Sequence, residues 1–184
     1  MYDYGFERCY VLEEIHFNAV DCICYGPMNG GQEAWSAFRW AGADCDGVVA
    51  YIGPDVKALN EKMFSSGSGG FQTIDGKIHY PGLKSVVFDE NTVLTDIAEE
   101  AFSGCTKLSD ITIPDTVTNI GISAFNGCKS LTSITIPDGI TKIADSMFAY
   151  CTSLTEVVIP GSVTSIGRSA FYECSALTGV SIPN

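Results

Sequence analysis

Positive charge is scarce in this chain. Its 184 residues include 10 Lys and Arg against 22 Asp and Glu, which gives a formal net charge of -12. The acidic excess lies mostly in residues 1–100, which hold 16 acidic and 6 basic residues. A chain this acidic repels phosphate groups and anionic lipid headgroups. The composition therefore argues against direct binding to nucleic acid or to a membrane surface.

Long apolar runs and a basic leader are also missing. No apolar stretch approaches the roughly 18 residues that a membrane-spanning helix needs. The first twenty residues lack a basic start followed by an apolar segment, which is the pattern of an export signal. If the chain is complete, the sequence predicts a cytoplasmic protein.

Catalytic and cofactor-binding motifs are equally rare. The two histidines, His16 and His79, lie near no nucleophile motif such as G-x-S-x-G. The glycine-rich stretches PMNGGQEAW and SSGSGGF lack the G-x-x-x-x-G-K pattern of a phosphate-binding loop. We therefore expect a protein that is not an enzyme and binds no cofactor.

What the sequence does contain is a 23-residue period. Phe102, Phe125, Phe148 and Phe171 are each 23 residues apart. A cysteine, a leucine and a pair of β-branched residues recur with the same spacing in each repeat: Cys105, Cys128, Cys151 and Cys174; Leu108, Leu131, Leu154 and Leu177; Ile111/Ile113, Ile134/Ile136, Val157/Ile159 and Val180/Ile182.

The repeat pattern resembles the BspA-like leucine-rich-repeat family, whose unit reads roughly L-x-x-I-x-I-P-x-x-V-x-x-I-x-x-x-A-F-x-x-C. The resemblance covers residues 83–184 closely. Degraded versions of the same spacing occur earlier in the chain, at Phe6, Cys9, Leu12, Ile15 and Phe17, and again at Ile52, Val56, Leu59, Met63 and Phe64. We expect one solenoid domain over residues 1–184, with irregular repeats in 1–82 and regular ones in 83–184. The irregular part contains two insertions, at about 18–47 and 65–81.

The residue pattern of one repeat explains how such a solenoid forms. The two Ile alternate with polar residues, which is the period of a strand with one buried face, and the proline that follows ends the strand. The A-F-x-x-C segment, with apolar residues three or four apart, suits a short helical turn. One repeat cannot bury these side chains alone, whereas stacked repeats can. The expected fold is a mainly β leucine-rich-repeat solenoid of the α/β type. It is a right-handed coil with parallel strands on one face and short helical turns.

Residues that flank the inner Ile of each strand should point outward and form a recognition face. A solvated sheet face, with Thr and Ser present only as strand formers, is the alternative interpretation. The first insertion adds an aromatic cluster that includes Tyr25 and Phe38 and is either a partner contact or a small local core. The predicted partner-binding residues are His16, Tyr51, Val87, Asp110, Thr112, Thr135, Glu156, Val158, Trp35 and Trp40.

Five of the eight cysteines share one repeat position, beside expected core residues. Cys9 and its four equivalents at positions 105 to 174 are therefore predicted to be small, reduced core residues without a metal. Cys22, Cys24 and Cys45 lie outside the repeat pattern. Together with His16 they could hold zinc, but C-x-C also fits an alternating strand, and we favour a structural role and expect no metal site.

Two functions remain open from the sequence. The family resemblance implies recognition outside the cell or at its surface. It therefore favours a non-catalytic protein-binding or adhesion module, whose partner is another protein or a glycan. The charge of -12 also suits an intracellular inhibitor or decoy that blocks the basic groove of a nucleic-acid-handling protein. The last expected strand, near Val180 and Ile182, has no following repeat, so self-association through the C-terminal coil is also expected.

Overall fold

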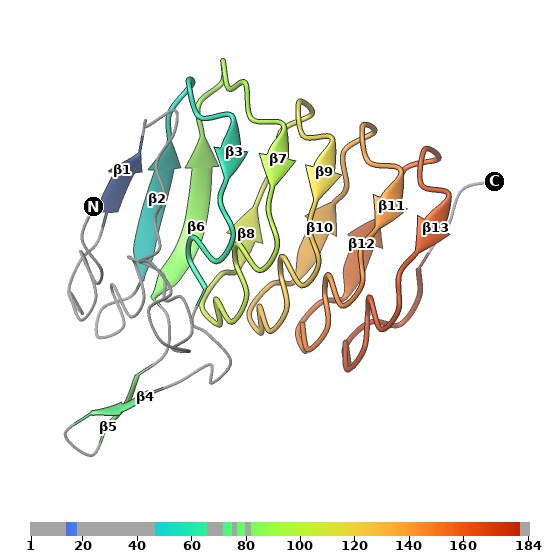
Figure 1. Ribbon diagram of the computed structural model, residues 1–184. Coiled ribbons are helices and arrows are strands. Elements are labelled where there is room, and N and C mark those ends of the chain that lie inside the picture. Colours follow the sequence, from blue (N-terminus) through green and yellow to red (C-terminus); the bar gives the residue numbers. More distant parts are fainter. Residues whose placement is uncertain (1–13, 18–46, 66–71, 75–76, 80–81, 181–184) are drawn as a thin grey trace, which may run out of the picture.

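A computed structural model gives the fold of the chain and describes residues 14–17, 47–65, 72–74, 77–79 and 82–180. Over these residues the chain winds into stacked coils, and most coils contribute two short strands (Figure 1). The mainly β solenoid of parallel strands predicted from the 23-residue period is confirmed. No helix in the described part of the chain is long and apolar enough to cross a membrane.

The first column of strands forms the face that we call the strand-bearing face. Its members are β1 (Glu14–Phe17), β2 (Val48–Ile52), β6 (Leu83–Phe88), β8 (Asp110–Ile111), β10 (Ser133–Thr135) and β12 (Glu156–Val158). They pair in parallel in the orders β1-β2-β6-β8 and β10-β12. Pairing places equivalent repeat positions opposite one another, so that Ala50 lies between Ile15 and Val86. All three of these side chains are buried.

The second column lies in front of the first in Figure 1. It consists of β3 (Ala58–Leu59), β7 (Asp96–Ile97), β9 (Asn119–Ile120), β11 (Lys142–Ile143) and β13 (Ser165–Ile166). These strands also pair in parallel, in the orders β3-β7-β9 and β11-β13. The V-x-x-I part of the repeat forms this column and gives each coil a second inward edge, because Leu59, Ile97, Ile120 and Ile143 are buried.

A proline starts the turn that joins the two columns in three consecutive coils, at Pro114, Pro137 and Pro160. The N–H of Val117 donates to the carbonyl of Pro114 at 3.0 Å, and the N–H of Ile140 donates to the carbonyl of Pro137 at the same distance. Proline has no N–H to leave unpaired at the end of a strand, and its fixed φ suits the first half of a turn. The predicted strand ends are therefore confirmed.

The A-F-x-x-C segments are turns, so the prediction of short helical turns was wrong; the described residues contain no helix. These segments do not form helices because every second N–H group points along the solenoid axis, toward the next coil. The N–H groups of Glu100 and Phe102 donate to the carbonyls of Ile122 and Ala124 in the next coil, at 2.9 and 2.8 Å. A helix would direct its N–H groups to carbonyls of its own segment.

A left-handed backbone position in each coil makes this alternation possible. Glu100, Ser123, Ser146 and Ser169 have φ values of 52 to 55°, two residues before the core phenylalanine. A left-handed conformation costs a non-glycine residue roughly 1–2 kcal/mol. The hydrogen bonds between coils offset this cost, because they satisfy buried donors that would otherwise lack a partner.

A stack of phenylalanine rings runs through the core. Neighbouring rings have centroids 5.2 to 5.6 Å apart and planes within 12° of parallel, in the order Phe64, Phe102, Phe125, Phe148 and Phe171. Phe125 is 0% exposed and Ile136 is 2% exposed, which confirms the core positions predicted from the repeat. The degraded repeat from Ile52 to Phe64 is confirmed too, since its five apolar positions are buried.

The second insertion contains structure that the sequence did not predict. Strands β4 (Gln72–Ile74) and β5 (Lys77–His79) pair antiparallel and project from one side of the solenoid (Figure 1). The first insertion lies outside the described residues, apart from Gly47.

Replacing Phe125 or Ile136 with Ala should lower the free energy of unfolding by about 2–5 kcal/mol, through lost packing and a residual cavity. Chemical denaturation followed by circular dichroism measures the change. Thr135→Ala, at the exposed position beside Ile136, is the matched control and should change stability by less than about 1 kcal/mol. An unfolding midpoint unaffected by both core substitutions would contradict the core described above.

Candidate functional site

The predicted recognition residues that fall in the described part of the chain all lie on the strand-bearing face. Each flanks a buried residue and is exposed or half-exposed: His16, Tyr51, Val87, Asp110, Thr112, Thr135, Glu156 and Val158. Trp35 and Trp40 lie outside the described residues, as do Tyr25, Phe38, Cys9, Cys22, Cys24, Cys45 and Ile182.

Parallel pairing aligns these outward residues in rows across the strands. His16 is opposite Tyr51, which is opposite Val87 on the next strand. Further along the solenoid, Thr135 is opposite Val158. The other outward row aligns Asp110 with Ser85, and Glu156 with Ser133.

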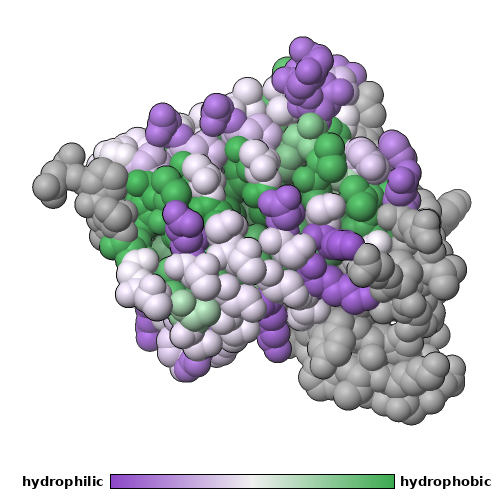
Figure 2. Space-filling view, turned by 180° about the vertical axis from the view of Figure 1, so that it is seen from behind, coloured by the Kyte–Doolittle hydropathy of each residue, from purple (hydrophilic) through white to green (hydrophobic). Residues whose placement is uncertain are grey.

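Apolar side chains are exposed along this face. Val87 is 45% exposed and Val158 is 49% exposed. Figure 2 views the molecule from the side of these strands and shows a hydrophobic band across the face, interrupted and flanked by hydrophilic residues. Exposed apolar side chains that gather in one band with hydrophilic residues around it are typical of an interaction surface.

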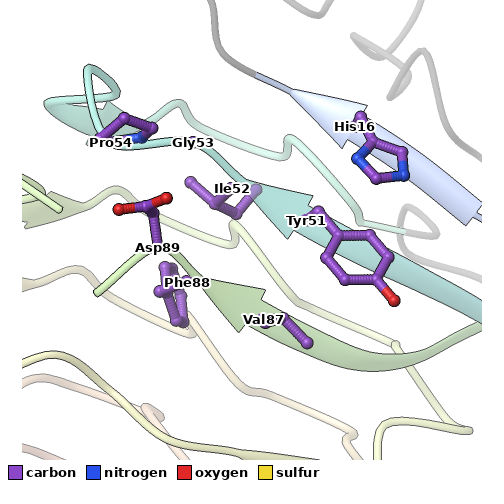
Figure 3. Close-up of a pocket in the computed structure, with 8 residues that line it drawn as sticks. All are labelled: His16, Tyr51, Ile52, Gly53, Pro54, Val87, Phe88 and Asp89. Atoms are coloured by element: carbon purple, nitrogen blue, oxygen red, sulfur yellow. The ribbon is translucent and has the colours of Figure 1, made fainter. Parts of the chain in front are cut away.

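The N-terminal part of the face contains an aromatic hollow of about 400 Å³ over β1, β2 and β6 (Figure 3). The rings of His16 and Tyr51 stack with centroids 4.5 Å apart and planes 8° from parallel. His16 Nε2 lies 3.3 Å from the Glu14 carboxylate, which holds the imidazole over the tyrosine. Val87 continues the same row, and Phe88 and Asp89 line the hollow where β6 ends.

An acidic groove of about 540 Å³ adjoins this hollow and shares Val87, Phe88 and Asp89 with it. Four carboxylates line the groove, and no lysine or arginine does: Asp89, Glu90, Asp110 and Asp115. None of the four forms a salt bridge with another described residue. The described residues include no group of three or more side chains suited to hold a metal ion.

Asp110 and Thr112 were predicted from the sequence, but the groove around them was not. Its signal in the sequence is the two residues that the first regular repeat has in addition after Phe88. They lengthen the turn, in which the N–H of Asn91 donates to Asp89 Oδ1 at 2.8 Å. Asp89 and Glu90 are thereby placed at the edge of the face, near the carboxylates of the next coil.

A further hollow of about 720 Å³ lies at the C-terminal end of the face. It is lined by Glu156, Val158 and neighbouring residues of β12, together with Gly179 and Val180. Its surface combines apolar side chains with one carboxylate. The predicted contact residues Glu156 and Val158 therefore border a depression of their own.

The four repeated cysteines that the structure describes offer no reactive site. Cys105, Cys128, Cys151 and Cys174 are free and buried, and each thiol donates to a phenylalanine carbonyl of the preceding coil at 3.0 to 3.3 Å. Burial raises the pKa of all four thiols, and that of Cys151 to about 12. A nucleophile or metal ligand needs the thiolate, which such a site disfavours. These findings confirm the packing role predicted for the four cysteines.

The sequence pattern described as the BspA type leucine rich repeat region matches residues 78–184 in six copies. No curated protein sequence matches the chain.

Solved structures of bacterial leucine-rich-repeat proteins have similar folds. The T. pallidum leucine rich repeat protein TpLRR is 22% identical with a TM-score of 0.58, covering 90% of this chain and 71% of its own. A leucine rich cell surface protein from Faecalibacterium prausnitzii A2-165 is 26% identical with a TM-score of 0.59, covering 91% of this chain and 47% of its own. The pneumococcal vaccine antigen PcpA is 20% identical with a TM-score of 0.68, covering 98% of this chain and 42% of its own. The present chain thus spans less than half the length of the latter two proteins.

Stability should fall at alkaline pH because the buried thiols stay protonated in the native state. Each raised pKa contributes stability that is fully present below the ordinary value of 9.0 and is lost as pH rises toward the native pKa. For Cys151 this window runs from about pH 9 to about 12, with a slope of up to about 1.4 kcal/mol per pH unit.

Denaturant unfolding at pH 8 to 11 measures this slope. Cys151→Ala lowers stability at every pH but should also flatten the alkaline slope, since one titrating thiol is gone. An unchanged slope in the variant would show that Cys151 ionises as readily in the folded as in the unfolded chain.

Proposed function

Because this chain belongs to the BspA-type leucine-rich-repeat family, we propose that it is a non-catalytic protein-binding module that holds its partner on the strand-bearing face. The observation that carries the proposal is the row of exposed apolar and aromatic side chains on an otherwise regular sheet. Tyrosine is enriched among the few residues that supply most of the binding energy at protein interfaces, and apolar side chains form the buried centre of such interfaces.

Threonine hydroxyls join neighbouring coils beside both strand columns, but two hydroxyls on the strand-bearing face form no such bond with a described residue. Beside the first column, Thr155 Oγ1 donates to the carbonyl of Thr132 at 3.0 Å. Beside the second column, Thr118 Oγ1 donates to the carbonyl of Thr95 at 3.3 Å, and Thr164 Oγ1 donates to the carbonyl of Thr141 at 3.2 Å. These hydroxyls join one coil to the next. On the strand-bearing face, the Thr112 and Thr135 hydroxyls bond to no other described residue. They are available to a partner without loss of an internal bond.

The stacked coils make this face suitable for recognition. Outward residues can differ from coil to coil because the core residues beneath them bear the packing. Strands of one column lie roughly 4.8 Å apart, so residues from several coils can contact one partner at once. The likeness at 26% identity to a protein described as a leucine rich cell surface protein supports an adhesive role. Glycan binding, an inhibitor role inside the cell and self-association through the C-terminal coil remain predictions from the sequence.

Site-specific photo-crosslinking tests which face binds. A benzophenone amino acid is placed at Thr112 or Thr135 on the strand-bearing face, and at Thr118 or Thr141 beside the second column as matched exposed controls. Each of the four proteins is mixed with surface proteins extracted from cells that the source organism contacts, and the mixture is irradiated. Mass spectrometry then identifies the crosslinked proteins. We expect the same protein to be captured from positions 112 and 135, with little capture from 118 and 141.

Equal capture from both columns would contradict the proposal, as would capture at none of the four positions. Addition of excess unmodified protein should compete the specific adducts away, which separates binding from random collision.

A further inference from the structure

We propose that the aromatic hollow and the acidic groove together bind a basic peptide segment of the protein partner that carries one apolar side chain. This inference rests on the proposed function and adds the chemistry of the partner. The hollow receives the apolar side chain, and the carboxylates of the groove face the lysines or arginines that flank it.

The apolar half of the site is the row from His16 to Val87. The His16 and Tyr51 rings are stacked face to face and held by Glu14, so little side-chain freedom is lost when a partner packs against them. Val87 is exposed beside Tyr51, and Figure 3 shows both side chains on the same side of their strands. An open hollow of about 400 Å³ suits one inserted side chain from a larger partner.

The charged half of the site is continuous with the apolar half because Asp89 lines both depressions. Glu90, Asp110 and Asp115 complete a group of four carboxylates that lacks an internal cation among the described residues. Their mutual repulsion is relieved when a partner supplies positive charge, which makes a basic segment the complementary occupant. An acidic segment would be repelled by the same four groups.

The two halves have different energetic roles. An exposed ion pair contributes little net binding free energy, and salt screens it. Burial of a leucine or aromatic side chain contributes considerably more. The apolar side chain should therefore supply most of the affinity, while the carboxylates select basic partners and speed their association.

Three synthetic nonapeptides test the inference by fluorescence anisotropy at low and moderate salt. The first alternates lysine and arginine around a central leucine, the second replaces the leucine with serine, and the third replaces the basic residues with glutamate. We expect the first peptide to bind most tightly. The second should bind more weakly by roughly tenfold or more, because it lacks the apolar side chain that supplies most of the affinity. The third should not bind detectably, because the four carboxylates repel its glutamates. Binding of the first peptide should weaken as salt is raised.

Paired variants locate the two contacts. The double variant Asp110→Asn and Asp115→Asn should weaken binding of the leucine peptide on the order of fivefold. The control is the double variant Glu99→Gln and Glu173→Gln, which removes the same charge from exposed positions outside the groove and should have little effect on binding. Val87→Ser should weaken binding of the leucine peptide but not binding of the serine peptide, because only the leucine packs against Val87. Ile166→Ser, at an exposed apolar position on β13 in the second column, is its control.

Equal binding of the basic and glutamate peptides would overturn the inference, as would binding that is insensitive to the Asp110 and Asp115 substitutions, or no binding of any peptide. If photo-crosslinking at Thr112 and Thr135 still captures a protein in that case, the strand-bearing face binds a partner of different chemistry. If crosslinking also fails, the proposed function falls with the inference.

Discussion

Hydrogen bonding between coils is the constraint on which the rest of this structure depends. A single coil leaves its core phenylalanine uncovered and half of its turn N–H groups without acceptors. The next coil supplies both, because the N–H of Phe125 donates to the carbonyl of Met147 while the two phenylalanine rings of these coils stack. The thiol of Cys151 adds a third link, to the carbonyl of Phe125. Every coil therefore has to repeat the geometry of its neighbour closely.

This demand for repetition separates residues that hold the fold from residues that are free to bind. The core positions, the left-handed serines and the threonine hydroxyls beside the second column are all used in joining coils. The outward positions of the strand-bearing face take no part in these links, and there the coils differ, with histidine, tyrosine, valine and threonine in equivalent positions. Chemical variety on a face whose backbone is uniform is what a recognition surface requires.

Much of the fold could be predicted from the sequence because the core is periodic. The spacing of Phe125, Cys128 and Ile136 relative to their equivalents indicates which side chains are buried, and the alternation around Ile134 indicates which residues face outward. The turn conformation could not be predicted, since the apolar spacing of A-F-x-x-C fits a helical turn as well as a ladder between coils. The ladder requires a positive φ at residues such as Ser123, whereas a helical turn does not. A serine in the sequence does not indicate a positive φ.

The candidate site was predictable in its position but not in its composition. The outward row followed from the strand pattern, whereas the acidic groove depends on a turn lengthened after Phe88, which breaks the period and brings Asp89 close to the next coil. Non-periodic features of this kind, like the hairpin of β4 and β5, arise from contacts that no repeat template encodes. The surface features that distinguish one coil of this solenoid from the next therefore lie where the sequence departs from the 23-residue period.

Hydroxyl-radical footprinting of the chain with its protein partner tests the central claim most directly, because the radical oxidises exposed side chains in proportion to their access to water. Tyr51, Val87 and Val158 report on the strand-bearing face, and the exposed Tyr150 and Tyr172 report on the turns. The account predicts that the partner protects residues of the first group and leaves the two turn tyrosines as reactive as before. Protection of Tyr150 and Tyr172 without protection on the strands would contradict it.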